Sequence, residues 1–180
     1  MKKLLTSILL TLVFYANAQY VKVTPQGLKD NNEEKSFVVL DLPNQTQADL
    51  YNKSVKYVHQ SFKNPEMVIK SNLPNESLRY VSYKPNGLKV SNGGVKIPVE
   101  IKYAIQLDFK DNKVRFEIVD QDFGGFMYSG NIWKGYPIWN EKNGKLRLED
   151  EKNELETYFN TVIIDYYNYL NGSSTKNEDW

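Results

Sequence analysis

The chain offers few side chains that could act as a nucleophile, a general base or a thiol ligand. Its 180 residues include one histidine, His59, and no cysteine. A catalytic triad or a histidine-based metal site needs partners that one histidine cannot supply. No G-x-S-x-G motif presents a serine, and the glycine-rich stretches lack the lysine and spacing of a phosphate-binding loop. We therefore predict no catalytic residue and no cofactor, and we expect His59 to have a structural or surface role.

Three carboxylates, Glu100, Asp108 and Glu117, are candidates for acid–base chemistry, because glycoside hydrolysis uses two carboxyl groups at a set separation. They fall on the polar face of a predicted pair of strands. Basic residues share that face: Lys96, Lys102 and Arg115. The mixture of signs favours a charged outer face with cross-strand pairs, so a carboxylate-dependent hydrolase is the third functional hypothesis.

One acidic stretch, Asp120-Gln121-Asp122 followed by Phe123-Gly124-Gly125, is a candidate cation loop. Oxygen ligands on alternate residues before a glycine can fold round Ca²⁺. Here Gly124 stands where a third ligand is needed, and no glutamate follows at the required spacing. The stretch therefore favours a solvated turn, and we predict no metal site.

Residues 120–150 form a segment rich in glycine and aromatic residues. Its candidate surface for a ligand or partner consists of Phe126, Tyr128, Trp133, Tyr136 and Trp139. Flat amphipathic rings contribute much contact energy at a low entropy cost, which suits a protein, peptide or glycan partner. The alternative, favoured for a small domain, is that these rings cover the open end of the sheet and complete the core.

The first eighteen residues have the three parts of a secretion signal. Lys2 and Lys3 form a basic start, an apolar run extends from Leu4 to Phe14, and Ala16-Asn17-Ala18 offers small residues at the positions that signal peptidase reads. The run is too short for a membrane-spanning helix of ~20 residues. We predict cleavage before Gln19 and export to the periplasm or the cell exterior. Without cysteine, the chain can carry neither a disulfide nor a lipid on a cleavage-site thiol, so we do not expect a lipoprotein.

The charge balance argues against nucleic acid as a partner. The precursor has 23 Lys and Arg against 22 Asp and Glu. Loss of Lys2 and Lys3 with the signal leaves 21 against 22, a net charge of −1. A nearly neutral domain has no electrostatic reason to seek a phosphate backbone.

The spacing of apolar residues predicts the elements that must hold these side chains. Phe37 to Leu40 is typical of a strand. Thr46 is the expected N-cap of a helix that ends before Pro65, with Asp49 as its capping-box partner. The apolar stripe from Leu155 to Leu170 predicts a second helix.

The clearest strand pattern runs from Val95 to Phe109, where apolar residues occupy every second position. This alternation predicts a long antiparallel strand with one buried face. Pro98 has no amide hydrogen, so we expect the start of the strand at an edge or bulge. Asp111-Asn112 should turn the chain into a strand over 114–118. Further expected features are short strands at 67–70 and 78–83, and turns at Pro85-Asn86-Gly87, Asn92-Gly93-Gly94 and Asn143-Gly144.

These elements predict an α+β fold of two layers: a curved antiparallel sheet with two helices packed on one face, in the order β-α-β-β-β-β-α. We expect a single domain over residues 36–172, with the aromatic segment as an insert. A flexible leader over 19–35 should precede it, and a disordered tail over 173–180 should follow.

Two stretches of the chain are informative together: residues 48–57 (ADLYNKSVKY) and residues 103–116 (YAIQLDFKDNKVRF). They resemble an exported family of Bacteroidetes-type bacteria, a domain of unknown function with a TATA-binding-protein-like (TBP-like) fold. The resemblance covers about Ser36 to Asp120, and Tyr57 stands where the family often has tryptophan. It implies the fold and export but no reaction and no site residues, since fold and function separate freely.

The leading functional hypothesis is an exported, non-catalytic binding or interaction module of the bacterial envelope. It is favoured because no nucleophile, metal cluster or cofactor loop is present, while the aromatic segment offers a surface. The second hypothesis is a carrier that grips a small apolar ligand between the C-terminal helix and the sheet. This hypothesis is supported by the broad apolar stripe on that helix.

Overall fold

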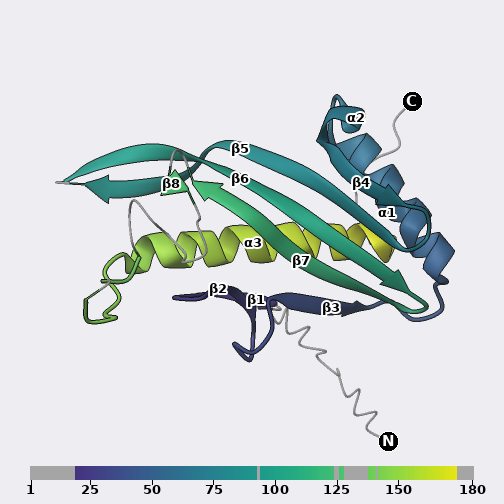
Figure 1. Cartoon of the computed structure of the whole chain (residues 1–180), viewed down its shortest axis with the longest axis horizontal. Helices are drawn as coiled ribbons and strands as arrows, with labels where there is room; N and C mark the ends of the chain where they lie inside the picture. Colours follow the sequence, from purple (N-terminus) through teal and green to yellow (C-terminus); the bar gives the residue numbers. More distant parts are fainter. Residues whose placement is uncertain (1–18, 93, 124–125, 128–137, 141, 174–180) are drawn as a thin grey trace, which may run out of the picture.

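The computed structural model describes residues 19–92, 94–123, 126–127, 138–140 and 142–173 (Figure 1). The predicted signal over 1–18 and nearly all of the predicted tail lie outside these ranges. Within them, an antiparallel sheet of six strands forms the body of the molecule, in the order β3-β7-β6-β5-β4, with β8 paired to β7. The strands are β3 (Phe37–Asp41), β4 (Ile69–Leu73), β5 (Ser77–Asn92), β6 (Val95–Lys110), β7 (Lys113–Phe123) and β8 (Phe126–Met127).

The alternation predicted for the central strand β6 is confirmed at the described side chains. Its inward residues are buried: Val99, Ile101, Tyr103, Ile105, Leu107 and Phe109. The residues between them are exposed or partly exposed, with one exception. Ala104 is only 1% exposed, and its short methyl group lies between Val81 and Val119 of the neighbouring strands. The outward positions of β6 are therefore mostly polar, with Pro98 and Ala104 as the apolar residues among them.

Both predicted long helices are present and pack on the same face of the sheet. Helix α1 (Gln47–Ser61) begins at the predicted capping box, in which Thr46 and Asp49 bond each other's backbone N–H. Helix α3 (Glu149–Leu170) runs along the sheet behind β5, β6 and β7 in Figure 1. The structure therefore confirms an α+β fold with helices on one face of an antiparallel sheet.

Large side chains fill the space between the helices and the sheet. On α3 the inward residues are almost completely buried: Leu155, Phe159, Ile163, Tyr166 and Leu170. Rings join the layers, with centroids 5.4 Å apart for Tyr103 and Phe159 and 5.3 Å apart for Phe116 and Tyr166. Between the helices, the Ser54 hydroxyl lies 2.6 Å from the Tyr166 hydroxyl, which satisfies two buried polar groups together.

Strands β5 and β6 form a hairpin much longer than predicted. The expected turn between Asn92 and Val95 is present, and Gly94 there has a φ of +84°. The turn expected at Pro85-Asn86-Gly87 is wrong, because β5 continues through these residues to Asn92. They form a bulge in which three residues of β5 lie opposite Glu100 of β6. Proline and glycine mark both turns and bulges, so the residue types alone did not separate the two.

The start of the domain also differs from the prediction. Residues 19–35 were expected to be a flexible leader, but β1 (Val21–Thr24) and β2 (Gly27–Asp30) form a hairpin that packs on α3. Val21, Val23 and Leu28 are buried, which explains why this segment is held. Residues 65–68, partly expected as a strand, form the short helix α2 (Pro65–Val68), because Pro65 suits the first helical position.

Candidate binding site on the open face of the sheet

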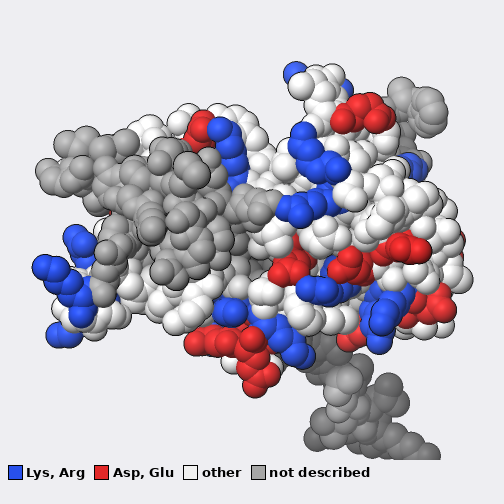
Figure 2. Space-filling view, viewed as in Figure 1, with Lys and Arg blue, Asp and Glu red and all other residues white. Residues whose placement is uncertain are grey.

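The face of the sheet that α1 and α3 leave uncovered carries charges of both signs. Figure 2 shows Lys and Arg beside Asp and Glu over the strands of this face. Two groups of these charged residues interact closely, one around Arg115 and one around Glu100. We call this surface the open face.

Arg115 is the centre of the first group. One guanidinium nitrogen lies 3.4 Å from Asp108, its direct neighbour across the strands, and another lies 2.6 Å from Glu117. Ser36 donates a hydrogen bond of 2.6 Å to the other oxygen of Glu117. The guanidinium carbon also stands 4.2 Å from the centre of the Phe37 ring, a cation–π contact. Arg115 therefore joins two of the three carboxylates that were considered for hydrolysis, Asp108 and Glu117.

Glu100 is the centre of the second group. Its carboxylate accepts a hydrogen bond of 2.6 Å from the Tyr83 hydroxyl and lies 3.0 Å from the ammonium of Lys102. The hydrogen bond from Tyr83, and then that from Lys102, lowers the pKa of Glu100. The ammonium of Lys102 in turn stands 5.5 Å from the centre of the Tyr83 ring. The three side chains hold one another, and Tyr83 remains 51% exposed.

A hollow of about 300 Å³ opens beside this second group. It is lined by Tyr83, Pro85, Asn86, Pro98, Val99 and Glu100. We call it the bulge pocket, since the bulge of β5 forms one wall. The side-chain amide of Asn86 makes no hydrogen bond within the described part of the chain, so its donor and acceptor are both available at the rim.

Local sequence explains why the bulge forms here. Three residues of β5 stand where a regular strand would have one, and Asn86 adopts a φ of +53°, which asparagine tolerates well. Gly87 is required by close packing, because a Cβ built on it would stand 2.7 Å from Cδ1 of Ile101. Pro98 lies in the part of β6 beyond the last residue that pairs with β7, so among the described strands that edge needs no amide donor. The prediction of an edge position for Pro98 is confirmed.

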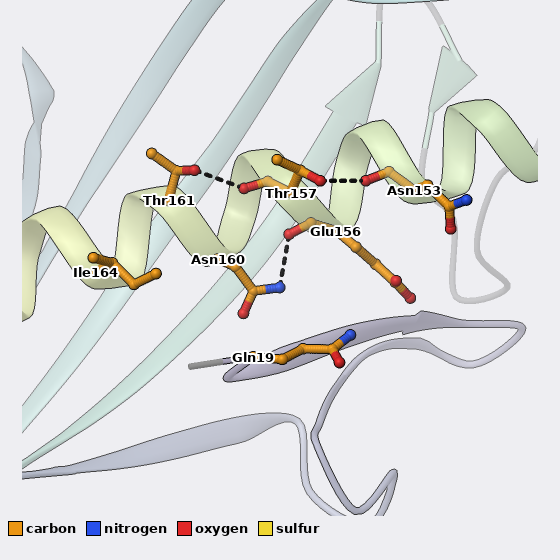
Figure 3. Close-up of a pocket in the computed structure, with 7 residues that line it drawn as sticks. All are labelled: Gln19, Asn153, Glu156, Thr157, Asn160, Thr161 and Ile164. Atoms are coloured by element: carbon orange, nitrogen blue, oxygen red, sulfur yellow. Dashed lines mark hydrogen bonds between the residues drawn. The ribbon is translucent and has the colours of Figure 1, made fainter. Parts of the chain in front are cut away.

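A second hollow, of about 510 Å³, lies along the outer side of α3 (Figure 3). Gln19 faces Glu156 and Asn160 across it. The Asn160 side chain accepts from the N–H groups of Tyr20 and Val21, at 2.6 and 3.0 Å, and donates to the Val21 carbonyl at 2.9 Å. Its polar atoms hold β1 in place, so this hollow is better explained by anchoring of the hairpin than by ligand binding.

The predicted aromatic surface is only partly described. Phe126 belongs to β8, where its backbone pairs with Phe123, which in turn pairs with Ile101. Trp139 is half-buried against the core and bridges to Leu146, beside the buried Ile138. Trp139 thus has the core packing of the alternative interpretation. Tyr128, Trp133 and Tyr136 lie outside the described residues.

Asp120-Gln121-Asp122 belongs to strand β7, so the expected solvated turn is wrong at these three residues. Among the described residues, no three His, Cys, Asp or Glu side chains gather closely enough to hold a metal ion. His59 is exposed in the last turn of α1, consistent with the surface role that we expected.

Sequence reasoning missed the bulge pocket as a unit. Pro85, Asn86, Gly87 and Pro98 were each recognised as special backbone positions, but they were assigned to a turn and to a strand end. The available signal was that a proline in each of two long alternating segments can mark a bulge. Only the pairing of β5 with β6 brings them together.

The fold places the protein among α+β proteins whose antiparallel sheet has helices on one face, as in a TBP-like fold. Residues 37–123 match the family model described as "Domain of unknown function (DUF4468) with TBP-like fold". The curated proteins gave no match.

Two crystal structures resemble the protein in fold. One, of a DUF4468 family protein from Bacteroides ovatus, has 16% sequence identity and a TM-score of 0.55, with 78% of this chain and 87% of that chain covered. The other, of a TBP-like protein from Parabacteroides distasonis, has 16% identity and a TM-score of 0.52, with 77% and 92% covered. At this identity the likeness concerns the fold alone. No helix in the described ranges is long and apolar enough to cross a membrane.

Proposed function

We propose that the protein is an exported, non-catalytic binding module of the bacterial envelope, and that the open face of the sheet is its binding surface. The observation that carries the proposal is the bulge pocket with the Tyr83, Glu100 and Lys102 group at its rim.

The state of the carboxylates supports a non-catalytic role. A glycosidase acid must hold a proton at neutral pH, usually through a raised pKa. Glu100 has the opposite shift, because Tyr83 and Lys102 both favour its charged form. Asp108 and Glu117 are linked through Arg115. The carrier hypothesis has little support either, because the rings of Tyr103, Phe116, Phe159 and Tyr166 fill the space between α3 and the sheet.

Export is supported by the N-terminal sequence together with the first hydrogen bonds of the fold. The predicted mature chain begins at Gln19, and the N–H of Tyr20 already donates to Asn160. To test export, the full 180-residue chain is produced in a bacterial host, and the intact mass is measured in the envelope and medium fractions. We expect a chain that starts at Gln19. An Ala18→Tyr variant should keep the full-length mass. A full-length wild-type chain retained in the cytoplasm would contradict export.

Binding at the open face is tested by hydrogen exchange of the purified mature chain with and without an envelope extract from the source organism. We expect slower exchange in β5, β6 and β7 and unchanged exchange in α1. The effect should be lost in a Tyr83→Ala, Arg115→Ala double variant and kept in Lys63→Ala, an exposed control beyond α1. Slowing confined to α1 and α3 would place the binding surface elsewhere. Hydrolysis of an extract component that disappears in Glu100→Gln would overturn the non-catalytic role.

A further inference from the structure

We propose that the bulge pocket is a recognition site for a neutral carbohydrate, with Tyr83, Asn86 and Glu100 as its contact residues. The inference rests on the proposed function, because it assigns a ligand class to the same open face.

The charge of the pocket selects against ionic ligands. Glu100 and Lys102 form an ion pair of 3.0 Å, so the rim carries one negative and one positive charge. A phosphate or another anion would meet the carboxylate of Glu100, which Tyr83 and Lys102 keep charged. A cationic side chain would have to displace Lys102 from Glu100. A neutral polar ligand meets neither penalty.

The hydrogen-bonding groups at the rim match a sugar. Adjacent hydroxyl groups each donate and accept, so they are best met by a carboxylate and an amide placed close together. Glu100 has lone pairs beyond those used by Tyr83 and Lys102, and Asn86 contributes an unused amide within the described part of the chain. Because Glu100 is held from two sides, its orientation costs little entropy when a ligand binds.

The pocket also offers apolar surface for the faces of a sugar ring. Tyr83 is half exposed, and two proline rings also line the hollow, Pro85 from β5 and Pro98 from β6. Rigid rings give contact area with little loss of side-chain freedom. A proline-rich peptide would instead need a series of aromatic residues along a groove, and among the described residues the lining has one, Tyr83.

The backbone of the pocket has features that carry an energetic cost, which favours a functional role for the bulge. A bulge that places a glycine against Ile101, a positive φ at Asn86 and a proline on the facing strand would be costly to keep without a use. The bulge has two residues more than a regular strand, an even number, so it leaves the inward faces of both halves of β5 unchanged. The fold itself therefore does not need it.

The proposal is tested by nuclear magnetic resonance with the mature chain labelled with ¹⁵N. Glucose, galactose, mannose and N-acetylglucosamine are titrated one at a time, with inorganic phosphate and oligoproline as comparison probes. We expect at least one sugar to shift the amide signals of Asn86, Gly87 and Glu100 in a saturable way, and phosphate and oligoproline to leave them unchanged. Shifts with none of the sugars, or with phosphate or oligoproline instead, would overturn the carbohydrate assignment.

Three variants then define the site. Tyr83→Ala should abolish the sugar-induced shifts, whereas Tyr83→Phe, which keeps the ring and loses the bond to Glu100, should weaken binding roughly three- to tenfold. Deletion of Pro85 and Asn86 should leave a regular, folded hairpin and abolish the shifts. Lys63→Ala should bind as the wild type does. If the deletion variant is folded and still binds the sugar, the bulge pocket is not the carbohydrate site.

The two proposals fail in different ways. If oligoproline or phosphate shifts the pocket signals, the ligand class is wrong while the open face remains the binding surface. If the envelope extract slows exchange in the helices alone, the open face itself is wrong. The sugar titration uses the wild-type chain, so a variant that fails to fold cannot hide the result.

Discussion

At the scale of single residues, Gly87 shows how one position fixes the shape of the bulge pocket. A Cβ at this position would stand 2.7 and 2.8 Å from two side-chain carbons of Ile101 and 3.1 Å from the carbonyl oxygen of Lys84. Ile101 is completely buried at the centre of β6 and has little freedom to move. Because residue 87 has no side chain, the backbone of the bulge can pack directly on the Ile101 side chain of β6.

We expect Gly87→Ala to destabilise the protein by about 1–3 kcal/mol, the usual cost of overpacking a filled site. Urea unfolding measures this change. Gly94→Ala is a useful comparison, because Gly94 has open space around it and its cost would come from its positive φ alone. If Gly87→Ala were as stable as the wild type, Ile101 would have to yield more than its burial suggests.

At the scale of elements, the β1–β2 hairpin is held by two side chains of α3, Asn160 and Glu156. Asn160 uses both atoms of its amide to bind the backbone of Tyr20 and Val21, much as a neighbouring strand would. Glu156, one turn earlier, accepts from the N–H of Val23 at 2.9 Å. The outer edge of β1 is thus paired with side chains of a helix, which protects an otherwise open strand edge.

We expect Asn160→Ala to weaken the docking of the hairpin by about 1–3 kcal/mol, because backbone groups of Tyr20 and Val21 lose their partners. Hydrogen exchange at the amides of Tyr20 and Val21 should become faster, while exchange in β6 stays slow. Thr161→Ala, on the exposed side of the same helix, is the matched control. Equal acceleration in β6 would show that the hairpin and the sheet unfold together.

Elements with a strong local signal were predicted well. The capping box at Thr46 and the alternation of β6 need only short-range rules, and both are confirmed. The leader and the bulge were missed because their structure depends on distant partners. Asn160 is 139 residues from Val21, and the bulge is recognisable only opposite Glu100. The bulge pocket, which is built from such long-range pairing, could not be predicted from local pattern.

At the scale of the whole molecule, the core is unusual in how many tyrosines it contains. Tyr80, Tyr103 and Tyr166 are almost completely buried. Burial raises the pKa of each of these three tyrosines. The pKa of Tyr57 is raised to about 12, mainly by burial and then by the negative charge of Asp165. The folded protein therefore keeps protons that the unfolded chain loses near the ordinary tyrosine pKa of 10.0.

This difference predicts alkaline destabilisation. Below pH 10 the tyrosines are neutral in both states, and their preference for burial is fully expressed. Above it the unfolded chain binds fewer protons than the folded one, so the free energy of unfolding falls as pH rises towards the folded pKa values. The slope should be about 1.4 kcal/mol per pH unit for each tyrosine that ionises only on unfolding.

Urea unfolding at a series of pH values measures the slope, and phenolate absorbance of the native protein reports which tyrosines titrate while it remains folded. Exposed tyrosines such as Tyr83 should titrate without unfolding the protein. Tyr166→Phe, which keeps the ring and removes the ionisable group, should reduce the slope. A stability that stays constant through this range would show that the buried hydroxyls ionise within the folded core.

The three-for-one arrangement opposite Glu100 has a consequence for how this protein can change. Any odd number of residues at this point returns the chain to the same side of the sheet, so the length of the stretch can change by two residues without reversing which side chains of β5 face the core. The bulge is therefore a stretch of variable length between two segments of β5 whose orientation in the sheet stays the same. Related chains can share the same sheet and differ in the bulge residues that contact a ligand.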